Sequence, residues 1–440
     1  MNRLFFLLLF YSSIAHTQVN KTALIDKYMK AQEKVNGFSG VVMITKNGKA
    51  LYKQAFGYAN REWNILNTTT TTFRIASITK QFTAVAILQL IAAGKLALHD
   101  PLSRFYPDFP RGDSVTIHML LNHTSGIKSF TAIQGFSKLE FLSLPKDSIV
   151  ALFSKEPYDF TPGSRYSYNN SAYFLLATII EKLSGLDYDT YLKTNIFSKS
   201  KLKHTGVEKT DSIMLHNATG YRYTPRGWKK SKPISMEFPL GGGNLVSTVD
   251  DLLLWQNTLF NRRILPDSLF FKMATPYLNR YGYALDIDSL GQHKRIGHDG
   301  NISGFGSYCY YYPADSLSVI VLSNKQGNIQ WLGQALAATV FDMPMILPYS
   351  HKEIKIDPIL LEPYIGTYET PEKNIIEIVK QEDKLFRKAG NVLTELKPES
   401  QTKFFFANAT DAQVFFEKRA NSYEAFIVRD GLVSPLKKIK

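Results

Sequence analysis

The sequence of 440 residues contains a single cysteine, Cys309, and no hydrophobic run long enough to cross a membrane. One cysteine excludes an intramolecular disulfide, and its distance from the N-terminus excludes a lipidated cysteine beside a signal cleavage site. We expect Cys309 to be a buried strand residue; a catalytic thiol is the alternative. Long low-complexity runs and internal repeats are also lacking. With 44% apolar and 20% charged residues, the composition is typical of a soluble globular protein.

The N-terminus predicts a secretory signal peptide over residues 1–17. Arg3 precedes the apolar run Leu4 to Phe10, and small and polar residues follow it up to Thr17. This order is that of a signal peptide, and the run is too short to span a bilayer. We expect cleavage before Gln18, a periplasmic or secreted protein, and no transmembrane segment in the mature chain.

The formal net charge is +14, from 52 lysines and arginines against 38 acidic residues. Nucleic acid is a poor partner for an exported protein. Anionic envelope material such as peptidoglycan or a lipid surface is a better candidate, and a merely solvated basic surface, with no such partner, ranks above both.

The stretch from Phe73 to Ala93 predicts a buried helix with chemistry at its start. Ser77 and Lys80 lie three residues apart at the head of an apolar run that ends before Gly94. On a helix this spacing brings the two side chains together, so the amine can reach the hydroxyl. A desolvated lysine can activate a serine, and free N–H groups at a helix start favour an oxyanion. A capping serine and a surface lysine are the alternative.

Two further stretches bear polar groups beside apolar elements. Tyr168 and Asn170 precede a helix that ends near Gly185, and His298 precedes the strands of a predicted antiparallel hairpin. Proton transfer and substrate orientation are one interpretation of these residues. A packed tyrosine, a helix N-cap and a satisfied loop histidine are the other. The glycine-rich segment 241–252 has a capping box but lacks the Lys-Ser/Thr end of a phosphate loop, so it predicts close backbone approach beside a cleft.

The pattern of strands predicts two domains. Segments 40–45 and 50–56 flank Asn47-Gly48, a strong hairpin signal, and the segments 308–312 and 317–322 form a second strand pair. From about Ile354 the chain becomes a series of short strand-like runs, which predicts a small β-barrel or sandwich over residues 354–440. Residues 18–350 form the predicted main domain.

These motifs together resemble the serine β-lactamase and penicillin-binding protein superfamily, in its class C β-lactamase-like branch. The resemblance rests on Ser77-Ile78-Thr79-Lys80, Tyr168-Asn169-Asn170 and His298-Asp299-Gly300 in this order. The neighbouring segments 120–126, 162–163 and 241–252 support it, and it covers roughly residues 23–341.

The resemblance implies an α/β (α+β) fold, with a central antiparallel sheet flanked by helices and an active site between the sheet and a helical region. It implies that Ser77 is acylated, that Lys80 is its base, and that Tyr168 carries the proton to the leaving group. Asn170 would contact Lys80 and the substrate. His298 and Gly300 would bind substrate, and the N–H groups of Ser77 and Asn301 would form the oxyanion hole. No metal or organic cofactor is implied.

The third motif departs from the Lys-Thr-Gly of class C β-lactamases. His298 at that place resembles D-Ala-D-Ala carboxypeptidases, D-amino-acid peptidases and related hydrolases, and a titrating group would hold a substrate carboxylate less firmly than a lysine. We therefore expect an exported serine hydrolase that cleaves amide bonds in D-amino-acid peptides or β-lactam-like compounds. A carboxylesterase of the same fold and a non-catalytic envelope-binding protein are the alternatives.

Overall fold

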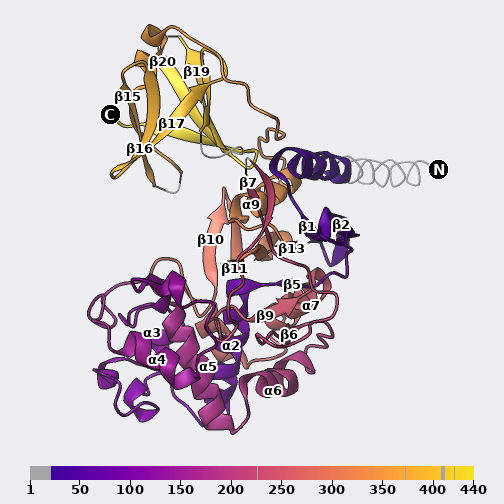
Figure 1. Ribbon diagram of the computed structural model, residues 1–440, viewed down its shortest axis with the longest axis vertical. Coiled ribbons are helices and arrows are strands. Elements are labelled where there is room, and N and C mark those ends of the chain that lie inside the picture. Colours follow the sequence, from indigo (N-terminus) through magenta and orange to yellow (C-terminus); the bar gives the residue numbers. More distant parts are fainter. Residues whose placement is uncertain (1–20, 225, 372, 408–411, 421) are drawn as a thin grey trace, which may run out of the picture. The chain divides into compact units, whose positions relative to one another are not determined.

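The computed structural model describes residues 21–440 except 225, 372, 408–411 and 421, so the predicted signal peptide lies outside the described residues. The chain folds into two compact units (Figure 1). One comprises Ser39–Gln330. The other comprises Trp331–Lys440 together with the helix over residues 21–36. The predicted domain limits at 18–350 and 354–440 stay a prediction.

The first unit is built on a six-stranded antiparallel sheet in the order β10-β11-β12-β13-β1-β2. Its strands are β1 (Gly40–Lys46), β2 (Lys49–Phe56), β10 (Asp286–Leu290), β11 (His293–Ile302), β12 (Phe305–Tyr312) and β13 (Leu317–Ser323). Lys46 pairs with Lys49 across Asn47-Gly48, whose φ angles of 52° and 72° are those of the tight turn that the sequence predicts. Cys309 is buried on β12, as expected.

A helical region accompanies the sheet (Figure 1). Its helices are α2 (Thr79–Ala92), α3 (Ile117–Leu121), α4 (Lys146–Ser154), α5 (Asn170–Ser184), α6 (Tyr188–Leu192), α7 (Val249–Phe260) and α8 (Asp267–Met273). Helix α2 is buried on almost every side, as its continuous apolar sequence predicts, and it packs against α5. Helix α7 packs against β1 and β13, and its Trp255 stacks on Phe82 of α2 with 4.1 Å between ring centroids. The sheet and α2 therefore share one hydrophobic core.

Short strands complete this unit. They are β3 (Tyr58–Asn60), β4 (Ile65–Leu66), β5 (Phe73–Arg74), β6 (Gly206–Val207), β7 (Tyr221–Thr224), β8 (Gly227–Lys230) and β9 (Leu245–Ser247). Strand β9 lies between β5 and β6. Because β5 leads into Ser77 and β9 follows the three glycines, this small sheet brings the two segments together.

The second unit contains a closed antiparallel barrel, which settles the barrel-or-sandwich alternative. Its strands are β14 (Gly366–Glu369), β15 (Ile375–Gln381), β16 (Lys384–Ala389), β17 (Val392–Pro398), β18 (Lys403–Phe406), β19 (Ala412–Arg419), β20 (Ser422–Arg429) and β21 (Leu432–Lys438). Aromatic and aliphatic side chains fill its interior. Helix α9 (Gln330–Val340) precedes it. The predicted fold class, a β-lactamase-like fold followed by a small β domain, is confirmed.

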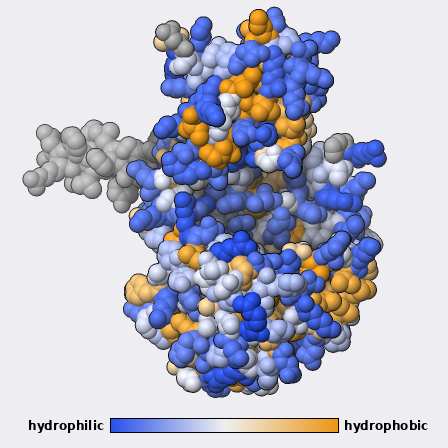
Figure 2. Space-filling view, turned by 90° about the vertical axis from the view of Figure 1, so that its left-hand side faces the viewer, coloured by the Kyte–Doolittle hydropathy of each residue, from blue (hydrophilic) through white to orange (hydrophobic). Residues whose placement is uncertain are grey.

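Polar side chains predominate on the face shown in Figure 2, with apolar side chains in smaller groups among them, as on most water-exposed surfaces. Within the described part of the chain, every helix is either too short or too polar to cross a bilayer.

Candidate active site

Ser77 lies on a tight turn between β5 and α2. The sequence predicts Ser77 on the first turn of the α-helix, whereas the α-helix begins at Thr79 and Ser77 belongs to the 3₁₀ turn Ala76–Ile78. Ala76 has a φ of 47°, a conformation that costs a residue with a side chain about 1–3 kcal/mol. Such strain persists only where the surrounding structure holds the backbone in place. The surrounding structure therefore fixes the conformation of Ala76, the residue before Ser77.

Lys80 points from α2 to the Ser77 hydroxyl. Its Nζ lies 3.2 Å from Oγ of Ser77, 2.9 Å from Oδ1 of Asn170 and 2.9 Å from the carbonyl oxygen of Gly242. The side chain is fully buried, with no acidic partner among these contacts. Burial therefore lowers the pKa of Lys80 from 10.5 to about 7. A large fraction of Lys80 is neutral at neutral pH and can accept a proton.

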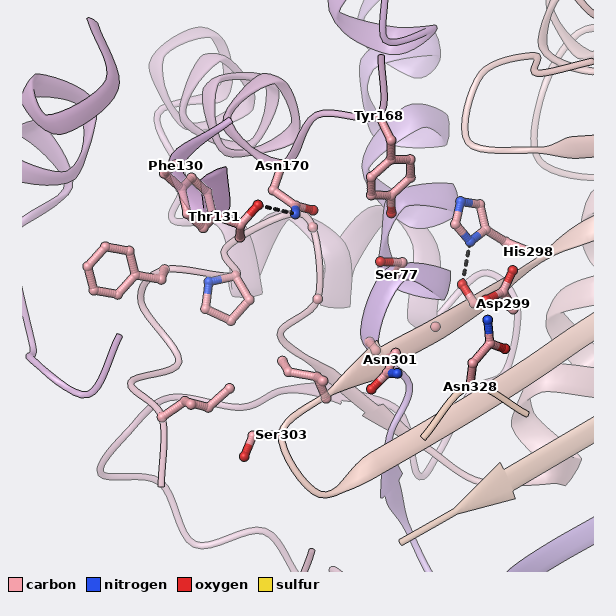
Figure 3. A pocket seen from close by; sticks show the side chains of 18 of the residues that line it. Ser77, Phe130, Thr131, Tyr168, Asn170, His298, Asp299, Asn301, Ser303 and Asn328 are labelled. Atoms are coloured by element: carbon pink, nitrogen blue, oxygen red, sulfur yellow. Dashed lines mark hydrogen bonds between the residues drawn. The ribbon is translucent and has the colours of Figure 1, made fainter. Parts of the chain in front are cut away.

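Tyr168 and Asn170 meet the same pair of residues from the start of α5. Asn169, not Asn170, caps that helix, because its side chain accepts the N–H of Ala172 at 2.9 Å. The side chain of Asn170 is thus available to Lys80. The hydroxyl of Tyr168 points toward Ser77 (Figure 3). Tyr168 is 37% exposed, but desolvation of its hydroxyl raises its pKa well above 10, although a hydrogen bond with Ser77 opposes the shift, so Tyr168 is a neutral phenol.

Strand β11 passes directly beside the Ser77 turn. A Cβ atom on Gly300 would lie 2.5 Å from Oγ of Ser307, 2.7 Å from the carbonyl oxygen of Ile75 and 2.8 Å from the backbone nitrogen of Ser77. Only glycine fits this approach. Asn301, the next residue, lines the same cavity. The strand thus runs beside the backbone nitrogen of Ser77, one of the two groups predicted to form the oxyanion hole.

His298 is buried and both of its ring nitrogens are engaged. Nδ1 donates to the backbone carbonyl of Asp299, and Nε2 lies 2.9 Å from the hydroxyl of Tyr281. Burial lowers the pKa of His298 to about 4, although the Asp299 carboxylate opposes the shift. This arrangement does not fit the titrating carboxylate anchor that the sequence suggests. His298 remains a predicted substrate-binding residue because it lines the cavity.

Two residues that sequence reasoning missed connect the second and third motifs. His123 is fully buried, and its Nδ1 accepts the backbone N–H of Asn169 at 3.2 Å. Its Nε2 must then carry the proton, which it donates to the hydroxyl of Tyr281 at 3.2 Å. Tyr281 in turn donates to Nε2 of His298. The chain of hydrogen bonds runs in one direction from the start of α5 to β11.

The only sequence signal for this chain is the segment Asn122-His123-Thr124-Ser125-Gly126, which belongs to the family resemblance. The ring of His123 lies 4.4 Å from that of Tyr168, between centroids. His123 therefore packs against the predicted proton shuttle. Tyr281 stands in an irregular segment before β10 and carries no motif of its own.

Ser77, Tyr168, Asn170 and His298 line one cavity of about 600 Å³, together with the predicted residues Gly300 and Asn301. Lys80 lies behind this lining and contacts three of its members, Ser77, Asn170 and Gly242. The structure thus brings all seven predicted site residues together. Phe130, Phe136 and Phe238 supply an apolar wall. A cavity of this size and mixed polarity fits a small substrate or a short peptide.

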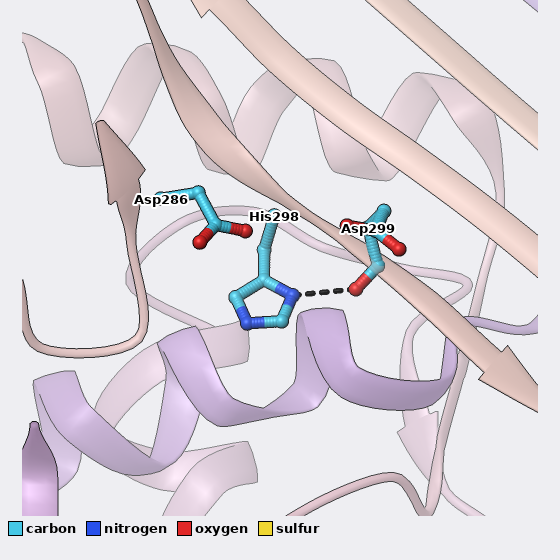
Figure 4. A group of neighbouring side chains, drawn as sticks. All are labelled: Asp286, His298 and Asp299. Atoms are coloured by element: carbon cyan, nitrogen blue, oxygen red, sulfur yellow. Dashed lines mark hydrogen bonds between the residues drawn. The ribbon is translucent and has the colours of Figure 1, made fainter. Parts of the chain in front are cut away.

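Asp286, His298 and Asp299 offer ligand atoms within 4.8 Å of one another, so they are the residues that could hold a metal ion (Figure 4). The two nitrogens of His298 are already used in hydrogen bonds. A metal would have to displace Tyr281 from Nε2. The cluster therefore presents chiefly two carboxylates.

The fold and this cavity are those of a serine hydrolase, and the comparison with known proteins agrees. The family model described as Beta-lactamase matches residues 22–336, more than half of the chain. The chain therefore belongs to the Beta-lactamase family, as the sequence motifs suggest.

Two curated relatives show the range of this family. Penicillin-binding protein 4* of Bacillus subtilis is 28% identical over 89% of this chain and 92% of its own length. The teichoic acid D-alanine hydrolase of Staphylococcus aureus is 28% identical over 69% of this chain and 74% of its own.

Two solved structures are similar as well. The octameric penicillin-binding protein homologue from Pyrococcus abyssi has a TM-score of 0.66 and 25% identity, covering 94% of this chain and 99% of that one. The D-stereospecific amidohydrolase from a Streptomyces species has a TM-score of 0.60 and 26% identity, covering 68% and 94%.

Proposed function

We propose that the protein hydrolyses its substrate in two steps through an acyl-enzyme on Ser77. The observation that carries this proposal is the buried amine of Lys80, which contacts the Ser77 hydroxyl at 3.2 Å and has a pKa lowered to about 7. Lys80 accepts the Ser77 proton while Oγ attacks the substrate carbonyl carbon. The N–H groups of Ser77 and Asn301 stabilise the developing oxyanion.

Tyr168 completes the first step. Its neutral phenol passes a proton to the leaving group as the scissile bond breaks, and Lys80 restores that proton. In the second step water loses a proton to Lys80 or Tyr168 as its oxygen attacks the acyl carbonyl carbon. The bond from that carbon to Oγ of Ser77 then breaks, and Oγ takes up the proton. Asn170 holds Lys80 through Oδ1 and presents its amide to the substrate.

We propose amide bonds next to a D-amino acid as the substrate class, with a D-alanyl ester as the second candidate. Relatives named as a D-stereospecific amidohydrolase and a teichoic acid D-alanine hydrolase support the two bond types respectively. Because the relatives named as a penicillin-binding protein and a teichoic acid D-alanine hydrolase, together with the signal-like N-terminus, point to the envelope, we also propose an exported protein that acts there. Binding to peptidoglycan through the basic surface belongs to the same proposal.

Covalent labelling tests the nucleophile. A fluorophosphonate probe should attach to Ser77, as mapped by mass spectrometry, and Ser77→Ala should abolish the adduct. Lys80→Ala should slow labelling by about 10²–10⁴-fold, the usual contribution of a general base. An adduct on another residue, or equal labelling of Ser77→Ala, would refute the proposal. Peptidoglycan binding without any adduct would instead support a non-catalytic binding protein.

A panel of substrates separates the bond types. A D-alanine anilide, a chromogenic cephalosporin, a D-Ala-D-Ala peptide and a short p-nitrophenyl ester should be compared by kcat/KM. Higher values for the anilide than for the cephalosporin are expected. A protein that turns over only the ester is a carboxylesterase.

A further inference from the structure

The cavity that contains Ser77 carries charge of the opposite sign to the protein as a whole. The chain has a formal net charge of +14, yet the side chains lining the cavity include three carboxylates, Glu140, Asp286 and Asp299. Among the lining residues that the structure describes, lysine and arginine do not occur. The acidic lining is therefore a local feature that the overall charge would not predict.

Asp286 and Asp299 lie close together on neighbouring strands. Asp286 is the first residue of β10, and Asp299 lies on β11 beside Gly300. Their carboxylates lie on either side of the His298 ring (Figure 4). Tyr310 donates a hydrogen bond to Asp286 at 3.0 Å. Burial raises the pKa of Asp286 to about 6 and also raises that of Asp299, because the nearby charge of Arg295 offsets burial only in part.

The charge of Arg295 lowers the pKa of both carboxylates, but its side-chain hydrogen bonds go to other residues. Both Nε and Nη2 of Arg295 donate to Asp288, and its Nη1 donates to Tyr308. In the described part of the chain, neither Asp286 nor Asp299 forms a salt bridge with a lysine or an arginine, and Arg295 pairs with Asp288 instead. His298 is neutral with both nitrogens in use. A positively charged group on the substrate would supply the cation that the described lining of the cavity lacks.

We propose that the cavity selects substrates with a free ammonium group on the acyl side of the scissile bond, and that Asp299 and Asp286 bind this group. The proposal rests on the proposed function and names its substrate class: N-terminal D-aminoacyl amides or esters. A substrate carboxylate at the same place is rejected by like charge.

The position of Asp299 fits this assignment. Its neighbour Gly300 packs against the backbone nitrogen of Ser77, so the acyl carbonyl that Ser77 attacks lies next to this part of β11. An α-ammonium group is only two bonds from that carbonyl carbon. It can therefore reach the carboxylates that line the same cavity while the carbonyl stays at Ser77.

A binding experiment on a variant that lacks the nucleophile tests the proposal independently of catalysis. Ser77→Ala should be titrated with D-alaninamide, which bears an ammonium group, and with N-acetyl-D-alaninamide and N-succinyl-D-alaninamide, which are neutral and anionic there. Calorimetry or NMR should show at least about tenfold tighter binding of D-alaninamide, the gain expected for a hydrogen-bonded charge. Equal affinities, or no measurable binding of D-alaninamide, would overturn the proposal. Binding that requires added Zn²⁺ or Mg²⁺ would overturn it in favour of a metal site.

Comparing the turnover of free-amine and N-acetyl substrates tests whether Asp299 and Asp286 bind the ammonium group. The ratio of kcat/KM for D-alanine p-nitroanilide to that for its N-acetyl derivative should fall about tenfold or more in Asp299→Asn, and to a smaller extent in Asp286→Asn. Asp108→Asn, which neutralises an exposed carboxylate outside the cavity lining, should leave the ratio at the native value. The ratio cancels general damage to the acylation machinery. An unchanged ratio in both cavity variants would overturn the assignment.

The two proposals fail separately. If fluorophosphonate labels Ser77 but the native protein prefers the N-acetyl substrate, only the ammonium assignment is wrong. If Ser77→Ala binds D-alaninamide selectively but native Ser77 is never acylated, the assignment stands and the catalytic proposal is wrong.

Discussion

At the scale of single residues, the ionisation of Lys80 decides whether Ser77 can react. A lysine of ordinary pKa would be an ammonium ion below pH 9 and could not take up a proton. The hydrogen bonds from Lys80 Nζ go to uncharged groups, namely a hydroxyl, an amide oxygen and a backbone carbonyl. Burial is thus not offset by an anion, and the pKa falls to about 7.

This value predicts the pH dependence of the reaction. On a neutral ester, kcat/KM should rise about tenfold per pH unit below pH 7 and level off above it, because only the neutral amine is a base. Tyr168, whose pKa burial raises above 10, should not contribute to this rise. Lys80→Arg keeps a permanent charge and should be inactive at every pH. A flat profile of the native protein from pH 5 to 9 would contradict this role of Lys80.

The hydrogen bonds also predict the proton positions on two histidines. His298 should be neutral at pH 6 with its proton on Nδ1, and His123 should be neutral with its proton on Nε2. Nitrogen-15 chemical shifts of labelled histidine report both. Tyr281→Phe removes the hydroxyl between them and should move the Nε2 signal of His298. Imidazolium shifts for His298 at pH 6 would restore the carboxylate-anchor hypothesis.

At the scale of elements, the site depends on how closely β11 approaches the turn before α2. The nearest atoms to a Cβ on Gly300 include the backbone of Ile75 and Ser77. Backbone cannot rotate away as a long side chain does, so the turn itself would have to move. The strained φ of Ala76 lies in the same turn.

Gly300→Ala should therefore slow fluorophosphonate labelling of Ser77 by at least about 10²-fold, the usual effect of losing an oxyanion donor. Gly206→Ala is the matched control, because its nearest neighbour is the flexible end of Met214 at 3.2 Å. The control should label at a rate close to that of the native protein. Similar rates in the two variants would show that β11 does not fix the Ser77 turn.

Elements with strong local patterns were predictable from the sequence. The turn Asn47-Gly48, the apolar run of α2 and a capping box before α7 each follow from neighbouring residues alone, and the structure assigns that cap to Thr248. The exact start of α2 was not predictable, because a 3₁₀ turn and an α-helical turn both bring the side chains of residues i and i+3 close together. Asn169 and Asn170 likewise fit the cap equally well until the contact with Lys80 separates them.

Long-range contacts set the limit of such prediction at the scale of the whole molecule. Tyr281 joins His123 to His298 across 158 and 17 residues of sequence, and Asp286 meets Asp299 only through the pairing of β10 with β11. Neither pair has a local pattern. The seven motif-based residues could be predicted to lie together because the family resemblance supplied their spatial relation, which the sequence of one chain does not contain.

The second compact unit joins distant parts of the chain in the same way. In the helix over residues 21–36, the hydroxyl of Tyr28 donates to the backbone carbonyl of Asp430 at 2.5 Å, and Gln32 donates to the Asp430 carboxylate at 3.2 Å. Asp430 lies in the turn between β20 and β21. The helix over residues 21–36 is therefore hydrogen-bonded to the last hairpin of the barrel.

A chain ending at Glu353 should separate the roles of the two units. The predicted catalytic residues all lie within Ser39–Gln330, so Ser77 should still be labelled. The helix over residues 21–36 should lose amide-exchange protection, because Tyr28 and Gln32 lose their hydrogen bonds to Asp430. In the full chain, Tyr28→Phe removes the hydrogen bond to Asp430 and the one accepted from Gln32, each worth about 1 kcal/mol, and should give an intermediate loss. Full protection of the helix in the shortened chain would show that it folds without the barrel.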